Sequence, residues 1–277
     1  ENGAWWAAYV NGEPKSDSLR METNYAAYIA TGVWHHFVIS ADDRFLSSMW
    51  PTVEKAIEFT LGLQTENGDI YWNIDAEKGI AEDSLTAGCC SIYKSLECAL
   101  NIASTLGYER PNLVLARARL GNALRNHPEY FNQHWESKEH FAMDWYYPVL
   151  TGVITGNSAR AHLTARWQEF VEPSLGCRCL STNPWVTVAE SCELVLALMA
   201  AGEHQKAAQL YSWLHDYREL DGAYWTGYVF TDDAVWPEEK PTWTAAAVLI
   251  AADALTEATP ASSLFTDVSL PAEVEYA

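Results

Sequence analysis

Carboxylates stand at or near the start of the strongly apolar helical segments of this sequence. Acidic residues are common there for a structural reason, because free amide hydrogens and the helix macrodipole attract negative charge. Carboxylates gathered at one end of several neighbouring helices can also do chemistry: a protonated acid and an ionised base together cleave a glycosidic bond. The carboxylates concerned are Glu22, Glu82, Asp83, Asp144, Glu190, Glu193, Glu238 and Glu239.

Asp144 and Glu190 are the predicted catalytic pair. Three aromatic residues directly follow Asp144, and their rings would desolvate its carboxyl and raise its pKa. Glu190 and Glu193 are three residues apart, so they share one face of a helix. Sequence does not give the separation of the two catalytic carboxyls, so inversion and retention of the anomer both stay open. The carboxylates predicted to contact substrate hydroxyls are Glu22, Asp83, Glu193 and Glu239.

Aromatic residues accompany these acids, and the chain has thirteen tryptophans. Aromatic rings in exposed loops usually need a ligand or partner to cover them, and flat rings suit the C–H faces of sugars. The alternative is that they only fill the wide mouth of the fold. The aromatics concerned are Trp5, Trp6, Tyr71, Trp72, Trp135, Trp145, Tyr146, Tyr147, Trp185, Tyr224, Trp225, Trp236 and Trp243. Those predicted to bind the substrate are Trp72, Trp145, Tyr146, Tyr147, Trp185, Trp225 and Trp236.

The elements that must position these residues are helices of two kinds, and no strand is expected. Amphipathic segments, each with one apolar face, alternate with segments that are apolar or small nearly all round, which must be surrounded by protein. The sequence therefore predicts alternating outer and inner helices. The outer helices are expected at 43–63, 110–124, 157–171 and 203–217, and inner ones at 24–38, 84–105, 187–201 and 242–256.

A glycine followed by aromatics recurs three times, in "ENGAWWAAY" at 1–9, "ENGDIYWNI" at 66–74 and "LDGAYWTGY" at 220–228. Each copy lies in a long connection between an outer and an inner helix, so the copies are predicted to be equivalent loops of a repeated hairpin. The first copy starts the sequence, so we expect a further hairpin to precede Glu1. Residues 1–277 are predicted to form a single all-α domain, an α/α toroid of the six-hairpin type.

Composition narrows the possible partners and cofactors. A formal net charge of −20 argues against nucleic acid and anionic membranes, and no apolar run is long enough to span a bilayer. The six cysteines form no Cys-x-x-Cys pair and mostly fall in apolar segments, which indicates a reducing, cytoplasmic location. Nucleotide-binding, serine-hydrolase and zinc-protease motifs are absent from the sequence. We therefore expect a small-molecule or oligosaccharide substrate, no metal and no cofactor, and leave the oligomeric state open.

Four segments carry a resemblance to a known group: "MDWYYPVLTG", "PWVTVAESCEL", "DGAYWTG" and "WPEEKPTWTAAAVLIAADAL". Together with the glycine-aromatic loops they resemble bacterial α/α-toroid proteins labelled prenyltransferase-like, over most of the chain. That group is similar in shape to six-hairpin glycosidases such as the glucoamylases, and to terpene cyclases. The cyclase proton-donor motif Asp-x-Asp-Asp does not occur here, since Thr231 and Phe230 precede Asp232 and Asp233.

The function predicted from these observations is that of a carbohydrate-active enzyme, a glycoside hydrolase with paired carboxylates in an acidic, aromatic-lined mouth. One alternative is a prenyltransferase-like or terpene-cyclase-like enzyme, whose aromatics would stabilise carbocations in a dry pocket. A second alternative is a toroid that binds carbohydrate without cleaving it, in which the carboxylates only cap helices.

Overall fold

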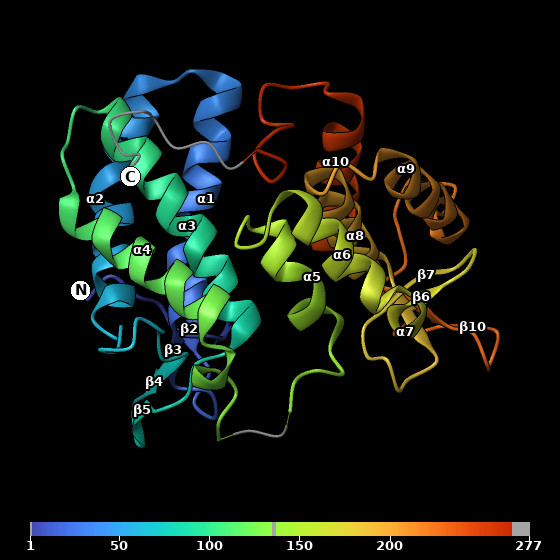
Figure 1. The fold of residues 1–277 in the computed structure, drawn as a ribbon, viewed down its shortest axis with the longest axis horizontal. Coiled ribbons are helices and arrows are strands. Elements are labelled where there is room, and N and C mark those ends of the chain that lie inside the picture. Colours follow the sequence, from blue (N-terminus) through green and yellow to red (C-terminus); the bar gives the residue numbers. More distant parts are fainter. Residues whose placement is uncertain (1, 135–136, 268–277) are drawn as a thin grey trace. The chain divides into compact units, whose positions relative to one another are not determined.

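The computed structural model describes residues 2–134 and 137–267 (Figure 1). Trp135 therefore lies outside the described residues. Within them the chain divides into two compact units, with unit 1 ending at Ser137 and unit 2 starting at Lys138. The prediction of one domain over residues 1–277 stays a prediction.

The described residues of unit 1 form four α-helices, arranged as two hairpins. The central helix is α3, which is buried along most of its length and packs on the other three. Only Ala41 and Asp42 separate the last residue of α1 from the first residue of α2. The Asp42 side chain accepts hydrogen bonds from the first amides of α2. The four helices are α1 (Thr23–Ser40), α2 (Asp43–Leu61), α3 (Thr86–Thr105) and α4 (Pro111–Asn126).

Unit 2 repeats this hairpin plan around α8, which packs on α5, α9 and α10. Buried side chains lie on nearly every face of α8, as expected for an inner helix. The expected outer helix at 157–171 is wrong in extent, because the helix ends at Ala165 and a separate short helix begins at Trp167. The α-helices of unit 2 are α5 (Ala142–Leu150), α6 (Gly156–Ala165), α7 (Trp167–Phe170), α8 (Val188–Ala200), α9 (His204–Trp213) and α10 (Thr242–Thr256).

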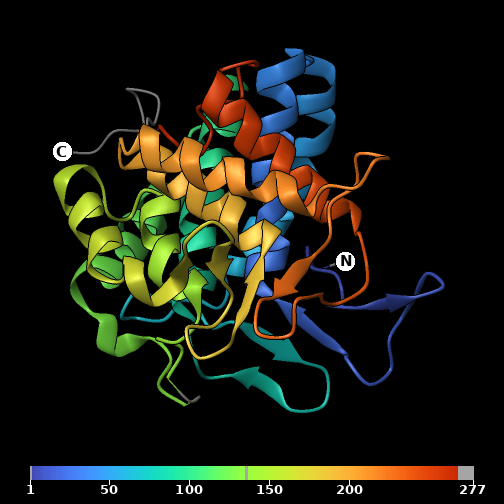
Figure 2. The ribbon, with the colours of Figure 1, turned by 90° about the vertical axis from the view of Figure 1, so that its right-hand side faces the viewer.

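The expectation that the chain lacks strands is wrong. In the described part of the chain, ten short strands occupy the long connections. Each is two or three residues long, too short to show an alternating pattern in sequence. Figure 2 shows the β1–β2 hairpin in dark blue and the β4–β5 hairpin in teal extending from the helices of unit 1. The strands of unit 1 are β1 (Tyr9–Val10), β2 (Glu13–Pro14), β3 (Arg20–Glu22), β4 (Asn73–Asp75) and β5 (Gly79–Ala81).

A five-stranded antiparallel sheet in unit 2 has the strand order β10-β9-β8-β7-β6. Its central strand β8 runs directly into α8, and β7 lies beside the first turns of that helix. The sheet therefore fixes the position of the residues that start α8. Its strands are β6 (Val171–Glu172), β7 (Gly176–Arg178), β8 (Trp185–Thr187), β9 (Gly227–Val229) and β10 (Ala234–Val235).

The three glycine-aromatic loops are built alike, as the repeat predicts. Gly3, Gly68 and Gly222 have φ angles of 88°, 97° and 91°, a left-handed conformation that favours glycine. In the second and third copies, the residue four before the glycine pairs with the residue two after it, in the bridges Gln64–Ile70 and Arg218–Tyr224. The second and third loops are therefore equivalent turns, and the first loop shares their glycine conformation.

Candidate active site

Two carboxylates lie on one face at the start of α8. Glu190 is in the first turn of the helix, and Glu193 lies three residues further along. The backbone before them is held by β8 and by Ser191, whose hydroxyl donates to the Thr187 carbonyl at 2.5 Å and accepts from the Cys177 amide at 2.8 Å. Sheet and helix thus present both carboxylates from a fixed backbone.

Glu193 is held by two tyrosine hydroxyls from α5. Tyr147 donates to Oε1 at 2.8 Å, and Tyr146 donates to Oε2. Burial and the negative charge of Glu190 raise the pKa of Glu193 to about 7, although the two tyrosine hydrogen bonds act in the opposite direction. A carboxyl that exchanges its proton near neutral pH is suited to general acid or base catalysis.

Glu190 is held by a hydroxyl and a thiol. Thr187, at the N-cap position of α8, donates its hydroxyl hydrogen to Oε2. The Cys179 side chain is hydrogen-bonded to the same carboxylate, and burial together with the charge of Glu190 raises the pKa of this thiol well above its usual value. The thiol therefore stays protonated and acts as a donor, which leaves Glu190 a positioned acceptor beside Glu193.

Asp144 is placed in the same region by the packing of α5 on α8. The amide of Ala142, at the start of α5, donates to the Cys179 carbonyl at 3.0 Å, so both helices begin beside β7. Asp144 precedes Tyr147 by one helical turn, as Glu190 precedes Glu193. Asp144 and Glu190 therefore each lie in the first turn of their helix, and the two helices pack on each other.

The guanidinium of Arg166 is close enough to Asp144 for the two charges to interact. The charge of Asp144 helps to raise the pKa of the Arg166 guanidinium, after the larger contribution of the ion pair with Glu169. The sequence predicts Asp144 and Glu190 as catalytic residues and Glu193 as a substrate contact. The structure brings together the two helices that carry them, α5 and α8, and the roles of the three residues stay predictions.

Partly or fully exposed aromatic residues lie in the sheet of unit 2 and in the loops beside it. Trp185 and Trp236 meet edge to face with ring centroids 5.0 Å apart, and Trp185 Nε1 donates to the Trp236 carbonyl at 2.8 Å. Trp225 donates from Nε1 to Glu219 at 2.8 Å, with the Lys240 amine 4.8 Å from its ring centroid. The exposed side chain of Glu239 lies in the same loop as Trp236, and its carbonyl accepts from the Thr226 amide.

Trp145 and Tyr146 differ from this group, because both are buried in the core of unit 2. Trp145 is 1% exposed, stacks on Phe170 at 5.0 Å and donates from Nε1 to the His162 carbonyl. Its ring therefore has no open face on which a sugar could stack. The ring packs in the core of unit 2. Tyr146 reaches the site only through its hydroxyl, and Tyr147 is buried as well.

The predicted residues of unit 1 are engaged in contacts within that unit. Glu22 is 7% exposed and ion-paired with Arg20, whose guanidinium lies 5.8 Å from the Trp72 ring centroid. Glu22 occupies the N-cap position of α1, but its side chain makes no capping hydrogen bond. Pairing with Arg20, and not helix capping, accounts for this buried carboxylate.

Asp83 lines a small polar cavity of about 140 Å³ in unit 1. Its carboxylate accepts hydrogen bonds from the backbone amides of Ser84, Gln133 and His134, so it holds the 130–134 loop in place. Asp69 lines the same cavity, is 4% exposed and accepts from Ser84 at 2.6 Å. Sequence reasoning missed Asp69, although it directly follows the glycine of the second glycine-aromatic loop.

The described residues show neither a metal-binding cluster nor a membrane-spanning helix. In residues 2–134 and 137–267, histidine, cysteine, aspartate and glutamate never gather in a group of three or more with the geometry to bind a metal. Over the same ranges, none of the helices has both the length and the apolar character required to cross a bilayer.

Solved structures of sugar enzymes share this fold at low sequence identity. A sugar epimerase from a ruminal bacterium aligns with a TM-score of 0.65 and 11% identity, over 91% of this chain and 74% of the epimerase. An α-amylase from Clostridium perfringens gives 0.61 and 13%, over 96% and 79%. A D-mannose isomerase gives 0.61 and 11%, over 89% and 73%. The predicted fold class, all-α of the α/α-toroid type, is confirmed by this likeness.

Sequence comparison gives a nearer relative, although no protein-family profile matches the chain. A protein of Mycolicibacterium hassiacum named MMP endo-(1,4)-3-O-methyl-alpha-D-mannosidase is 45% identical over 274 residues, which are 99% of this chain and 74% of that protein. These findings support the predicted similarity to glycosidases. They give no support to the predicted similarity to prenyltransferase-like proteins. The chain is a carbohydrate-active enzyme of the glycoside hydrolase type and belongs to the family of this mannosidase.

Proposed function

We propose that the chain cleaves internal (1,4) linkages in chains of 3-O-methyl-α-D-mannose, using the carboxylates at the start of α5 and α8. The observation that carries the proposal is the pair Glu190 and Glu193, two carboxylates on one helix face of which one has a pKa of about 7. The name of the mannosidase relative supports the sugar and the linkage.

Glu193 is the proposed proton donor. Burial and the charge of Glu190 keep its proton on near neutral pH, so it can protonate the glycosidic oxygen as the bond from that oxygen to the anomeric carbon breaks. An ionised carboxylate must act at the anomeric carbon, either directly or by taking a proton from water. Asp144 and Glu190 are the two proposed candidates for this second role, since they lie in the first turns of neighbouring helices.

The exposed aromatics are proposed to bind the sugar chain beside these carboxylates. Partly exposed rings are carried by Trp185 in β8, and by Trp225 and Trp236 in the loops next to β9 and β10. Stacking on such rings together with hydroxyl contacts to Glu239 fits a neutral, methylated sugar better than a charged ligand. For unit 1 we propose substrate contacts by Glu22, Asp83 and Trp72.

The decisive experiment is product analysis with oligosaccharides of (1,4)-linked 3-O-methyl-α-mannose, with unmethylated (1,4)-α-mannose oligosaccharides and maltooligosaccharides alongside. We expect cleavage of the methylated chain, and a loss of 100-fold or more in kcat for Glu193→Gln. Of Asp144→Asn and Glu190→Gln, the variant with the larger loss identifies the second catalytic carboxylate. Glu58→Gln, an exposed carboxylate on α2, is the matched control and should retain full activity.

Turnover of geranyl or farnesyl diphosphate in the same panel, without sugar release, would overturn the proposal in favour of the prenyltransferase-like alternative. Binding of the oligosaccharides without release of products by the parent protein would favour the non-catalytic alternative. Full activity in all three carboxylate variants would remove the catalytic assignment while leaving the family unchanged.

We also propose a cytoplasmic location, because the cysteines are free thiols and form no disulfides with one another. All six are free thiols, and five of them are buried. Recovery of the protein from its host cytoplasm with six titratable thiols would support this location, whereas a disulfide in the isolated protein would contradict it.

A further inference from the structure

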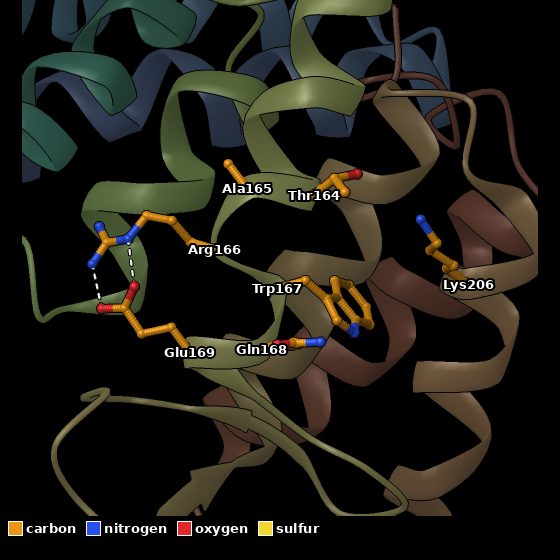
Figure 3. Close-up of a pocket in the computed structure, with 7 residues that line it drawn as sticks. All are labelled: Thr164, Ala165, Arg166, Trp167, Gln168, Glu169 and Lys206. Carbon is orange, nitrogen blue, oxygen red and sulfur yellow. Dashed lines mark hydrogen bonds and ion pairs between the residues drawn. The ribbon is translucent and has the colours of Figure 1, made fainter.

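A cleft in unit 2 is formed where the α6–α7 corner faces α9. Its volume is about 410 Å³, within the range of small-molecule sites. Figure 3 shows the Arg166–Glu169 pair on one side of the close-up and Trp167 on the other, pointing toward Lys206. The residues that line the cleft are Thr164, Ala165, Arg166, Trp167, Gln168, Glu169 and Lys206.

Trp167 is the aromatic surface of this cleft. In the short helix α7, Phe170 is fully buried and stacks on Trp145, whereas Trp167 remains partly exposed. The Lys206 amine lies 5.8 Å from the centroid of the indole ring, and the ring makes no hydrogen bond to the rest of the described chain. An indole in this position offers an apolar face for stacking, and its N–H is available as a donor.

The polar groups around Trp167 are neutralised in pairs. Arg166 forms an ion pair with Glu169 and also donates to the Glu139 carbonyl at 2.7 Å. Lys206 forms an ion pair with Glu203 at 2.9 Å. Because each cation near the ring has a carboxylate partner, the cleft has little net charge, and a neutral ligand with many hydroxyls suits it better than a phosphate or a carboxylate.

Two contacts connect the cleft with the start of α5, where Asp144 lies. Phe170 stacks on Trp145, the residue after Asp144, and the charge of Asp144 contributes to the raised pKa of Arg166. The cleft therefore lies in the same unit as the carboxylates of α8 and close to the start of α5. A binding surface for a sugar chain in this cleft would therefore lie in the same unit as the candidate active site.

We propose that the Trp167 cleft is an accessory binding site for a neutral oligosaccharide chain, with the sugar stacked on the indole and its hydroxyls contacting Gln168, Thr164 and Lys206. The inference rests on the proposed function for the identity of the sugar. Its physical basis, an exposed indole in a charge-compensated cleft, is independent of which carboxylate is catalytic.

The test measures binding and cleavage separately. Binding of long and short (1,4)-linked 3-O-methyl-α-mannose oligosaccharides is measured by calorimetry in a Glu193→Gln background, so that no chain is cleaved during the titration. We expect Trp167→Ala to weaken binding of the long chain by 5-fold or more, a range typical of one lost stacking contact. The short chain should bind within 2-fold of the parent, and Trp167→Phe should restore most of the long-chain affinity.

Two further variants control for folding and for position. Lys206→Ala alters the cleft at a residue of α9, whereas Trp167 is in α7. Like Trp167→Ala, it should weaken binding of the long chain. Trp34→Ala, which removes a partly exposed indole from α1 in unit 1, should leave binding unchanged. Equal long-chain affinities in the parent, Trp167→Ala and Lys206→Ala would overturn the accessory site.

The outcomes separate this proposal from the proposed function. If the parent protein cleaves the methylated chain but Trp167→Ala binds long chains normally, the accessory site fails and the hydrolase stands. If the parent binds long chains through Trp167 but cleaves none, the hydrolase fails and the accessory site stands. If the parent protein binds none of the oligosaccharides, both proposals fail.

Discussion

Tyr147 and Glu193 are joined across α5 and α8 by a hydrogen bond of 2.8 Å from the tyrosine hydroxyl to Oε1. The bond stabilises the ionised carboxylate, and with that of Tyr146 it opposes the effects of burial and of Glu190. The proton affinity of Glu193 is therefore a balance that single substitutions can move in either direction.

Tyr147→Phe removes a donor to the carboxylate and should raise the pKa of Glu193 by about one to two units, since a hydrogen bond to a charged group contributes roughly 1.5–3 kcal/mol. If Glu193 is the proton donor, the basic limb of the pH profile of kcat/KM moves to higher pH by the same amount. Tyr211→Phe removes a hydroxyl that bonds the Val248 carbonyl instead and should leave the limb in place. A shift of the limb toward acid in Tyr147→Phe would contradict the assignment.

Glu190→Gln should move the pKa of Glu193 the other way. It removes a negative charge that raises this pKa, so the pKa falls toward the ordinary glutamate value. Carboxyl ¹³C chemical shifts of labelled glutamate, followed through a pH titration, would measure the change without any need for activity. An unchanged titration of Glu193 would show that the two carboxylates do not interact.

Stability should also report the raised pKa of Glu193. The folded-state pKa of about 7 lies above the unfolded value of 4.5. The stabilisation is therefore fully present below pH 4.5 and is lost as the pH rises through 7, by at most about 3 kcal/mol. Glu193→Gln does not ionise, so its stability relative to the parent should increase between pH 4.5 and 8 in urea unfolding. A constant difference across that range would mean that the folded-state pKa is not raised.

Gly68→Ala should destabilise the protein by about 2–4 kcal/mol. The residue has a φ of 97°, and a Cβ there would lie 2.7 Å from the Arg119 carbonyl oxygen of α4, so strain and overpacking add. Gly79→Ala is the matched control: its φ is 78°, but the space around its Cβ is open, and a cost of about 1 kcal/mol is expected. Similar losses for the two variants in urea unfolding would mean that the contact with α4 does not matter.

The thiols should react slowly in the folded protein. Burial raises the pKa of Cys89 to about 12 and that of Cys98 to about 11, and Cys177, Cys179 and Cys192 are shifted in the same direction. Since the thiolate is the reactive form, a disulfide reagent at pH 8 should modify less than one thiol in minutes, and six after unfolding. Rapid modification of the native protein would contradict this.

The helices could be predicted from sequence because their signals are long. The amphipathic period at 43–63 and the continuous apolar run at 242–256 correspond to α2 and α10 within a few residues. The strands could not, because a strand such as β8 is three residues long and its pairing is decided by β7 and β9, which come from other parts of the chain. The equivalence of the glycine-aromatic loops was visible because it depends on local turn geometry.

The candidate site was only partly predictable. The carboxylates of α5 and α8 stand out by their position at the start of apolar helices, but the special environment of Glu193 requires two tyrosines more than forty residues away in the chain. Trp145 was expected at the mouth because it follows Asp144. Its burial follows from the packing of Phe170, which no local pattern reports.

The strand order of the sheet in unit 2 also has a consequence for how the protein folds. Neighbouring strands β8 and β9 are separated in the chain by the whole hairpin of α8 and α9. Without that hairpin, pairing Thr187 with Gly227 would close a long flexible loop at a large entropic cost. The helical hairpin should therefore form first and the sheet second. The surroundings of Glu190, and with them the candidate active site, would then be among the last parts of unit 2 to assemble.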